Sequence, residues 1–363
     1  MQKSIAQTFV QRSALPLGVM HALGYNEGMA WDMIGHQWAV DLLQGHIRRG
    51  AVRHAYLFTG PEGVGRRTLA LRFAQALVCE QPPAAGEACG QCRACRQIAR
   101  QTYPDLHVVQ REEGTTVIKV EQIRALERAL ALTPHGPYRI ALLRNFEEAH
   151  PSAANALLKT LEEPPGKVVL LLTAESAESL LPTVVSRCEV LRLRAVPTHT
   201  LSTALQTRHG LPAERADFLA HLSGGRPGYA LRLHQNPDLL TARTEAIEAL
   251  LNLLPADRIQ RFAFAEKVSK ARDDLRDLLT VWLSFWRDVL VLTSGAAVPT
   301  THVDYHDTMQ ALASAVTADQ ALQLVQEITQ ALDDLDHFVN TRLVAENVML
   351  SLPSTVIPQP SLP

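Results

Sequence analysis

Residues 60–68 read Gly-Pro-Glu-Gly-Val-Gly-Arg-Arg-Thr, a glycine-rich turn that follows the short apolar run 55–59. The next residues, 69–77, have the composition of a helix. A strand, a glycine turn and a helix N-terminus in this order are the context of the phosphate-binding loop G-x-x-x-x-G-K-[ST]. Gly60 and Gly65 stand at its two glycine positions, with Gly63 between them. The stretch therefore predicts an α/β protein with a P-loop; the alternative is an arginine-rich turn in an unrelated α/β protein.

Two side chains of this loop depart from the working motif. Arg66 stands at the lysine position, and Arg67 stands where a hydroxyl would hold Mg²⁺. A planar guanidinium fork does not fit the slot of a thin lysine, and a cation does not ligate a metal ion. Thr68 is one residue further along the helix, where its side chain is turned by about 100°. We therefore expect a degenerate P-loop that does not bind ATP productively, formed by Gly60, Gly63, Gly65, Arg66, Arg67 and Thr68.

Length and charge set outer limits on the class of protein. The chain has 363 residues, enough for two or three domains. Its formal net charge of −2 weighs against a strong overall attraction to phosphate backbones. No apolar run is long enough to span a bilayer, and the first residues lack the apolar stretch of a signal peptide, which favours the cytoplasm. Residues 1–28 show no firm periodicity; they are either a disordered extension or the result of a start codon assigned too far upstream.

Four cysteines follow the loop and its helix at the spacing of a metal site. Cys79, Cys89, Cys92 and Cys95 form C-x9-C-x2-C-x2-C. Thiolates two residues apart can turn toward one Zn²⁺, and four of them complete a closed tetrahedral site that has a structural role. The alternatives are disulfide pairing, which is less common in cytoplasmic proteins, and a redox C-x-x-C pair. The spacing favours structural zinc.

A second apolar run, 139–144, predicts another strand of the sheet. In an active P-loop ATPase such a strand ends in an acidic pair that serves Mg²⁺ and the attacking water. Those two positions hold Arg144 and Asn145 here. Glu147 and Glu148 come slightly later, and at strand rise they would lie roughly 10 Å beyond the strand's end. We expect them to be solvated acids in the first turn of the next helix; a shifted but working acidic pair is the alternative.

Two further strings resemble one family closely. Residues 155–165 read Asn-Ala-Leu-Leu-Lys-Thr-Leu-Glu-Glu-Pro-Pro, and 186–188 read Ser-Arg-Cys. With the four-cysteine insertion, they resemble the clamp-loader AAA+ proteins of bacteria, over about residues 29–352. The resemblance implies a RecA-like α/β domain with a parallel sheet, an inserted zinc module, a helical lid and an all-helical collar. It also implies a ring that opens a sliding clamp and loads it on primer-template DNA, with partner subunits of the gamma/tau and delta types.

Domain limits follow from the resemblance and from the pattern of breaks. The RecA-like domain is expected over 29–196, with the zinc module at 79–95; the lid over 197–246; and the collar or oligomerisation domain over 247–352. The proline-rich tail 353–363 is expected to be disordered. Broad apolar faces along 275–290 and 321–335 suit either core packing or contacts between subunits.

The resemblance also implies roles for single residues. Arg187 matches an arginine that acts in trans, as a finger on ATP bound by the neighbouring subunit. Thr173 matches the first sensor position of the family. At the second sensor, Gly228 stands where an arginine is expected, and Arg226 comes two residues early.

The resemblance implies a subunit of a DNA polymerase holoenzyme. The departures from the ATPase motif favour a subunit that has no catalytic activity of its own and for which ATP binding is doubtful. One alternative is an active ATPase that uses a divergent P-loop and the pair Glu147 and Glu148. The other is a zinc-dependent nucleic-acid-binding module with a vestigial ATPase body.

Overall fold

The computed structural model describes residues 31–296, 298–337 and 339–355. The extension expected at 1–28 and most of the tail expected at 353–363 lie outside these residues. The described chain divides into two compact units, one formed by residues up to 220 together with 225–231, the other by 221–224 and the residues from 232 onward. The domain limits given above stay predictions. No helix in the described part of the chain has the length and apolar content needed to cross a membrane.

The first unit is built on a five-stranded parallel sheet. Apolar residues occupy both faces of its central strands, as expected when helices cover both sides. β4 lies between β3 and β1, with Leu172 opposite both Leu57 and Leu143 in the register. The strand order is β2-β3-β4-β1-β5, formed by β1 (Ala55–Thr59), β2 (Leu106–Val109), β3 (Arg139–Leu143), β4 (Val168–Ala174) and β5 (Glu189–Arg192).

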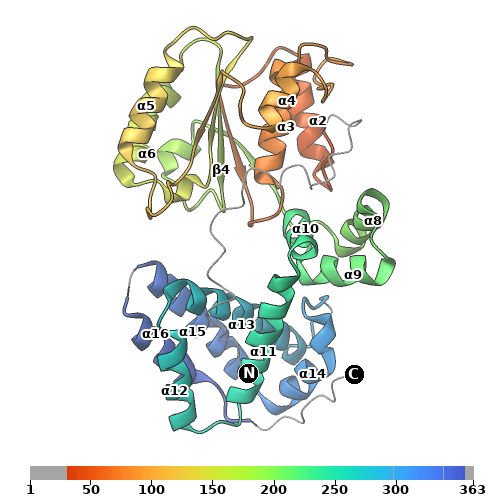
Figure 1. Cartoon of the computed structure of the whole chain (residues 1–363), viewed down its shortest axis with the longest axis vertical. Helices are drawn as coiled ribbons and strands as arrows, with labels where there is room; N and C mark the ends of the chain where they lie inside the picture. The colour runs from red at the N-terminus through yellow and green to blue at the C-terminus, as the bar shows by residue number, and fades with distance from the viewer. Residues whose placement is uncertain (1–30, 297, 338, 356–363) are drawn as a thin grey trace. The chain divides into compact units, whose positions relative to one another are not determined.

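Helices cover both faces of the sheet, which confirms the predicted α/β class (Figure 1). Tyr56 and Phe58 pack on the side of α2, α3 and α4, whereas Leu57 packs on the side of α5 and α6. The alternation of neighbouring strand residues between the two faces produces two separate apolar layers. The helices concerned are α2 (Gln37–Arg48), α3 (Arg66–Val78), α4 (Arg93–Ala99), α5 (Val120–Leu130), α6 (Pro151–Glu162) and the short α7 (Pro182–Val185).

The chain continues as helices only, and the C-terminal unit is entirely helical in its described part. Trp282 and Trp286 of α13 are fully buried at its centre. The apolar faces predicted along 275–290 and 321–335 supply this core, so packing within the unit accounts for most of their breadth. Three helices precede this unit along the chain: α8 (Thr198–His209) and most of α9 (Ala213–Leu222), which belong to the first unit, and α10 (Pro227–Gln235), whose residues are divided between the two units. The C-terminal unit continues with α11 (Pro237–Leu253), α12 (Arg258–Val268), α13 (Arg272–Thr293), η3 (Val303–Tyr305), α14 (His306–Ala315), α15 (Ala318–Asp336) and α16 (Thr341–Ser351).

Candidate functional site

The glycine loop lies between the carboxyl end of β1 and the N-terminus of α3. Gly60 has φ 141°, and its N–H donates to the carbonyls of Ala174 (3.3 Å) and Glu175 (3.0 Å). A Cβ at Gly60 would lie 2.2 Å from the carbonyl oxygen of Leu193, so no other residue fits there. Gly65, with φ 115°, begins α3. The loop is thus hydrogen-bonded to the end of β4 and packs closely against the backbone just after β5.

The outer side of the loop is covered by the protein itself. The Gly63 carbonyl accepts a hydrogen bond from the N–H of Gly228 (2.7 Å) at the start of α10. A Cβ on Gly63 would lie 2.8 Å from the Tyr229 nitrogen, so the two backbones touch. The next carbonyl, that of Val64, is 3.2 Å from His36 Nε2. Two loop carbonyls are therefore engaged by protein groups before any ligand arrives.

Arg66 is buried where a P-loop lysine would stand. Only 7 % of the residue is exposed, and its Nη1 lies 3.9 Å from Oε1 of Glu147. At that separation the contact is an ion pair without a hydrogen bond, and Nη1 has no hydrogen-bond acceptor among the described residues. Thr68 is half buried in the first turn of α3. The most deeply buried charged residue of the loop is therefore a cation that faces an acid of this chain.

The expectation for Glu147 was wrong. It lies in a separate turn, η2 (Phe146–Glu148), and not in the first turn of α6. Asn145 adopts φ 48° and turns the chain sharply after β3, so the assumption of continued strand rise failed. Oε1 of Glu147 accepts the N–H of Glu175 (3.2 Å) at the end of β4. Burial raises the pKa of Glu147, and nearby Arg66 opposes that rise.

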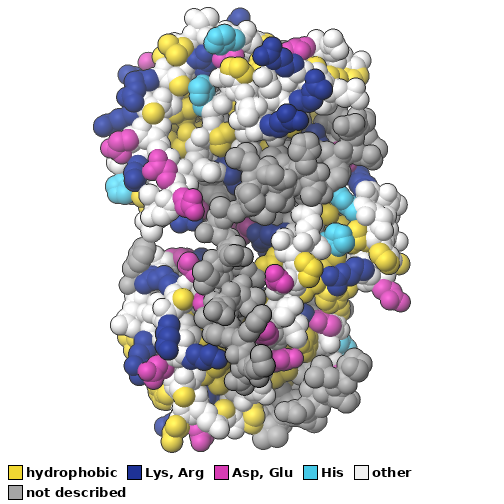
Figure 2. All heavy atoms as spheres, in the orientation of Figure 1, with side chains coloured by type: hydrophobic (Ala, Val, Ile, Leu, Met, Phe, Trp, Pro, Cys, Tyr) yellow, Lys and Arg dark blue, Asp and Glu magenta, His cyan; other side chains and the backbone are white. Residues whose placement is uncertain are grey.

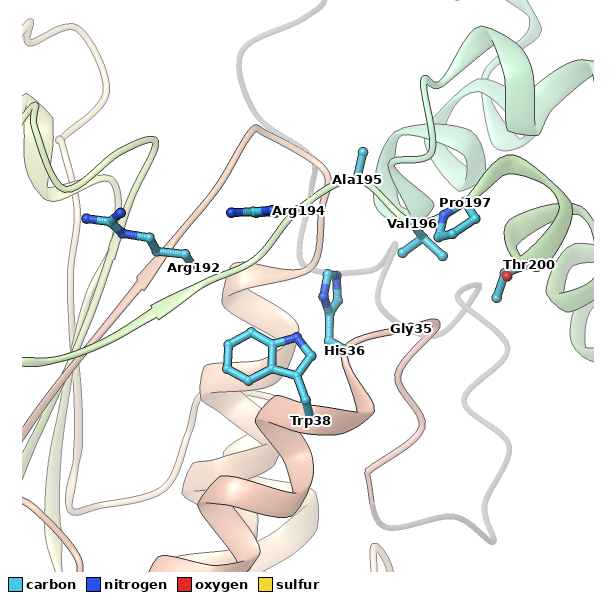
Figure 3. A pocket seen from close by; sticks show the side chains of 9 residues that line it. All are labelled: Gly35, His36, Trp38, Arg192, Arg194, Ala195, Val196, Pro197 and Thr200. Carbon is cyan, nitrogen blue, oxygen red and sulfur yellow. The ribbon is translucent and has the colours of Figure 1, made fainter. Parts of the chain in front are cut away.

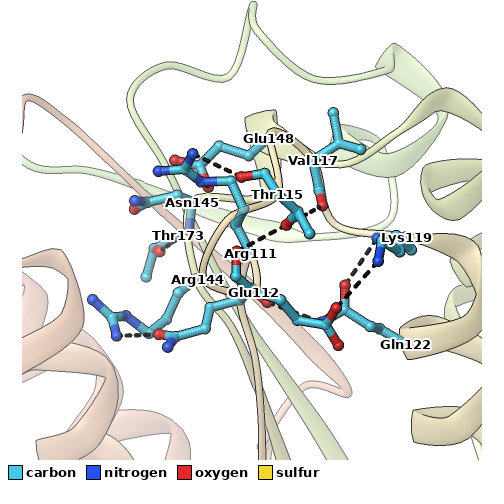
Figure 4. Close-up of polar contacts among 11 residues, drawn as sticks. Arg111, Glu112, Thr115, Val117, Lys119, Gln122, Arg144, Asn145, Glu148 and Thr173 are labelled. Atoms are coloured by element: carbon cyan, nitrogen blue, oxygen red, sulfur yellow. Dashed lines mark hydrogen bonds and ion pairs between the residues drawn. The ribbon is translucent and has the colours of Figure 1, made fainter. Parts of the chain in front are cut away.

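The residues at the ATPase acid positions are engaged elsewhere (Figure 4). Burial, reinforced by the charge of Arg67, lowers the pKa of Arg144 to about 10, and its Nη1 donates to Gln110 Oε1. The Asn145 N–H donates to Thr173 Oγ1 (2.9 Å), so the predicted sensor hydroxyl serves the turn after β3. Glu148 pairs with Arg111, with 3.3 Å between Oε2 and Nε. No acid therefore stands at the end of β3.

Arg187 lies just after α7, and no contact joins it to loop residues 60–68 in the described chain. Its Nη2 donates to Oε1 of Glu162 (2.6 Å), the last residue of α6. Its Nη1 donates to the Thr183 carbonyl (2.8 Å) and lies 3.4 Å from Ser186 Oγ. The side chain is 34 % exposed. The loop and Arg187 thus form two separate sites in one chain.

The four predicted cysteines come together. Their Sγ atoms all lie within 4.8 Å of one another, and those of Cys89 and Cys95 are 4.0 Å apart. A zinc–sulfur tetrahedron with bonds of about 2.3 Å places its sulfurs about 3.8 Å apart, whereas a disulfide needs about 2 Å. The N–H groups of Cys89, Cys92 and Cys95 donate to the sulfurs of Cys79, Cys89 and Cys92, respectively. The donor set therefore fits a metal ion and contains no disulfide.

The thiols of this cluster differ in acidity. Burial alone would raise the pKa of Cys89, but the N–H groups of Cys92 and Gln91, together with the neighbouring thiols of Cys79 and Cys92, outweigh it and lower that pKa to about 7. Burial raises the pKa of Cys79 and Cys95. The fifth cysteine, Cys188, lies outside the cluster, and burial raises its pKa to about 12. A bound cation would compensate for the cost of deprotonating the buried thiols.

One hollow was not anticipated from the sequence. A cavity of about 490 Å³ opens between the start of α2, the end of β5 and the start of α8 (Figure 3). Trp38 on its wall is 51 % exposed, and Arg192 and Arg194 contribute positive charge. None of these residues belongs to the glycine loop, Arg187 or the cysteine cluster.

Comparisons with known proteins match both units. The family model described as DNA polymerase III, delta subunit, matches residues 35–197, and the model of its C-terminal part matches 237–353. The delta' subunit of Yersinia pestis is 30 % identical over 318 residues, which cover 85 % of this chain and 92 % of that protein. The chain belongs to the delta' family of DNA polymerase III subunits.

The chain is similar to two further delta' subunits and to proteins described as tau and gamma-related. The delta' subunit of Escherichia coli is 28 % identical over 86 % of this chain and 94 % of its own length. That of Pseudomonas aeruginosa is 42 % identical over 55 % of this chain and 61 % of its own length. The tau subunit of Escherichia coli is 32 % identical over 62 % of this chain and 36 % of that protein. A gamma subunit-related protein of Thermotoga maritima covers 86 % of this chain and 97 % of its own, with a TM-score of 0.43 and 18 % identity.

The Arg66–Glu147 pair predicts a pH-dependent loss of stability. Arg66→Ala removes the positive charge beside a largely buried carboxylate and should lower the free energy of unfolding by about 1–3 kcal/mol at pH 7. The folded pKa of Glu147 is raised, so the folded state binds the proton more tightly than the unfolded chain. Stability then falls as pH rises from the unfolded pKa through the folded pKa, and the variant should lose more than the parent over that window.

Denaturant unfolding between pH 4.5 and 8 measures this effect. Glu147→Gln in the Arg66→Ala background is the matched control, because an amide has no charge to leave uncompensated. It should recover most of the loss at pH 7. A penalty that is equal at all pH values and insensitive to Glu147→Gln contradicts the pairing.

Proposed function

We propose that this chain is a non-hydrolysing subunit of the DNA polymerase III clamp loader. It helps to load the sliding clamp on primed DNA and supplies Arg187 to ATP bound by a neighbouring subunit. The observation that carries the proposal is the presence of Arg66, Arg67 and Arg144 at the three positions where an ATPase needs a lysine, a hydroxyl and an acid. The chain is thus a component of a nucleotidyltransferase complex without catalytic activity of its own.

Electrostatics supports the loss of hydrolysis. Mg²⁺ requires oxygen ligands, and the positions that would provide them carry guanidinium groups. Burial is the main cause of the lowered pKa of Arg144, and repulsion by the charge of Arg67 adds to it. A divalent cation placed near Arg67 and Arg144 would be repelled by both guanidinium groups. The site is partly buried, so this Coulomb repulsion is weakly screened. Contact between the Gly63 and Gly228 backbones also leaves less space for a nucleotide to reach the loop.

Family membership supports the partner subunits that we propose for this chain. The tau subunit of Escherichia coli shares sequence with this chain over 62 % of its length, as expected for a ring of related subunits. We therefore propose subunits of the gamma/tau and delta types as direct partners, in the cytoplasm. The sliding clamp and primer-template DNA are reached through the complex.

The surface gives little support to a separate role in nucleic-acid binding. Lys and Arg side chains occur together with Asp and Glu side chains on the face drawn in Figure 2. The formal net charge of the chain is −2. Binding of DNA by the isolated chain that weakens steeply with salt would favour that alternative instead.

Nucleotide titration of the purified chain tests the loss of hydrolysis. Calorimetry should show no Mg²⁺-dependent binding of ATP in the micromolar range, and a phosphate-release assay should show no turnover. The double substitution R66K/R67T should also show no turnover, because Arg144 and Asn145 still lack the acid that holds the metal and polarises water. Turnover by the parent chain that disappears in Glu148→Gln would establish the active-ATPase alternative.

Substitution of Arg187 tests the trans-acting role. In the reconstituted loader, Arg187→Ala should leave assembly intact and slow hydrolysis at the neighbouring site, because such fingers contribute ~10³-fold or more to phosphoryl transfer. Steady-state ATP turnover of the whole complex should fall by the fraction of total hydrolysis that occurs at that site. Arg192→Ala, which changes an exposed arginine of β5 paired with Glu178, is the control and should have no effect. Equal turnover in the two variants would remove the finger from the proposal.

We also propose that Cys79, Cys89, Cys92 and Cys95 hold one structural zinc ion. The residues between Cys79 and Cys89 lack regular secondary structure, so a cross-link at their ends would stabilise the fold of this segment. Four thiolates would leave no open coordination position, which fits a structural role and not a catalytic one.

Metal analysis checks this proposal. One zinc ion per chain is expected by mass spectrometry of the metal content, and Cys95→Ala should abolish it and lower the melting temperature. Cys188→Ala is the matched control, because Cys188 is a largely buried thiol outside the cluster, and it should retain the metal. Full zinc content in Cys95→Ala, or none in the parent purified without chelators, would contradict a four-cysteine site.

A further inference from the structure

Both terminal nitrogens of the Arg187 guanidinium are anchored, but these bonds do not use all of its N–H donors. Nη1 donates to the Thr183 carbonyl (2.8 Å) and lies near Ser186 Oγ (3.4 Å), while Nη2 donates to Glu162 Oε1 (2.6 Å). A guanidinium carries five N–H donors. No bond from Nε to another described residue accompanies these contacts, and Nη2 has a second hydrogen. Donors therefore remain for phosphate oxygen atoms while the group stays anchored.

Glu162 is the anchor of Arg187 that lies outside the segment carrying this arginine. The Thr183 carbonyl and Ser186 belong to α7 and its C-cap, so they move together with Arg187. Glu162 is instead the last residue of α6, a twelve-residue helix whose inner face is buried against the sheet. The pair thus fixes the arginine relative to the main body of the domain. α6 and α7 also pack against each other.

Stability does not account for this ion pair. The side chains of Arg187 and Glu162 are 34 % and 52 % exposed, so water and salt screen their attraction. An exposed pair of this kind contributes little to folding. Its clearest physical effect is to restrict a long side chain that otherwise samples many rotamers.

We propose that Glu162 is a positioning residue for Arg187. It holds the guanidinium at the end of α6 in the free subunit and in the ring, so that the arginine meets the neighbour's phosphates already oriented. This inference rests on the trans-acting role of Arg187 proposed above. Ordering the side chain in advance removes an entropy cost that would otherwise fall on the transition state.

The loader reconstituted with Glu162→Ala tests the inference. Loss of one anchor should lower kcat for ATP hydrolysis at the site that receives Arg187 by about three- to tenfold, the scale of side-chain ordering. KM for ATP should change by less than about twofold, since an interaction formed in the transition state acts on kcat. Glu162→Gln keeps an acceptor oxygen and the shape of the side chain, so it should lie between the parent and Glu162→Ala. If the alanine variant assembles poorly, the kcat of Glu162→Gln is the measurement that tests the inference.

Two comparisons separate positioning from a merely structural role. Glu163→Ala changes the adjacent exposed acid at the C-cap of α6 and should leave kcat unchanged. In an Arg187→Ala background, Glu162→Ala should add nothing, because there is no guanidinium left to orient.

The outcomes distinguish this inference from the proposed function. If Arg187→Ala slows turnover and Glu162→Ala does not, positioning by Glu162 is wrong and the finger stands. If Glu162→Ala slows turnover equally with and without Arg187, Glu162 acts by another route and the inference fails. If Arg187→Ala itself has no effect in an intact complex, both fail.

Discussion

A guanidinium buried beside a glycine loop needs a negative charge within a few ångströms, because water no longer screens it. In a working P-loop the cation at this position faces the phosphates of the nucleotide. In this chain the cation is Arg66, and the negative charge comes from the chain's own Glu147, 3.9 Å away. The pair joins the start of α3 to the turn after β3. A contact that an ATPase makes through its ligand is thus made here through protein side chains alone.

The rest of the first unit is consistent with such internal contacts. Carbonyls of Gly63 and Val64 are met by Gly228 and His36, and the Thr173 hydroxyl accepts from Asn145. Each of these groups lies near the end of a strand where a nucleotide-dependent switch would operate. Protein groups engage these atoms without a bound nucleotide, which is consistent with the proposed non-hydrolysing role.

Arg187 and the cysteine cluster depend on different parts of the same scaffold. The cluster follows α3 and is closed at its far end by α4, whose N-cap is Cys92. Arg187 depends on the ends of α6 and α7, on the other side of the sheet from α3. Neither site shares a residue with the glycine loop. The proposed loss of hydrolysis at the loop therefore places no constraint on the roles proposed for Arg187 and for the cysteine cluster.

Much of the fold could be predicted because it depends on local patterns. The apolar runs 55–59, 139–143 and 168–172 became central strands of the sheet, and the cysteines at two-residue spacing came together. The departures of Arg66, Arg67 and Arg144 from the ATPase motif could also be identified, since a motif assigns each position its residue type; their effect on ATP binding stays a prediction. The positions of the acidic side chains were harder to predict. Glu147 was expected in water because its distance along the strand was counted, and the positive φ of Asn145 was not foreseen.

The sequence by itself determined the fold class, the family resemblance, the broken catalytic positions and the cysteine cluster, because each follows from residue identity at a fixed spacing. Only the tertiary structure decided which charges meet. Glu147 reaches Arg66 and Glu162 reaches Arg187 through segments 81 and 25 residues apart, brought together by the packing of helices on the sheet. Side-chain pairing across such distances depends on turns and helix ends, where a single backbone angle redirects the chain, and no local pattern in the sequence encodes it.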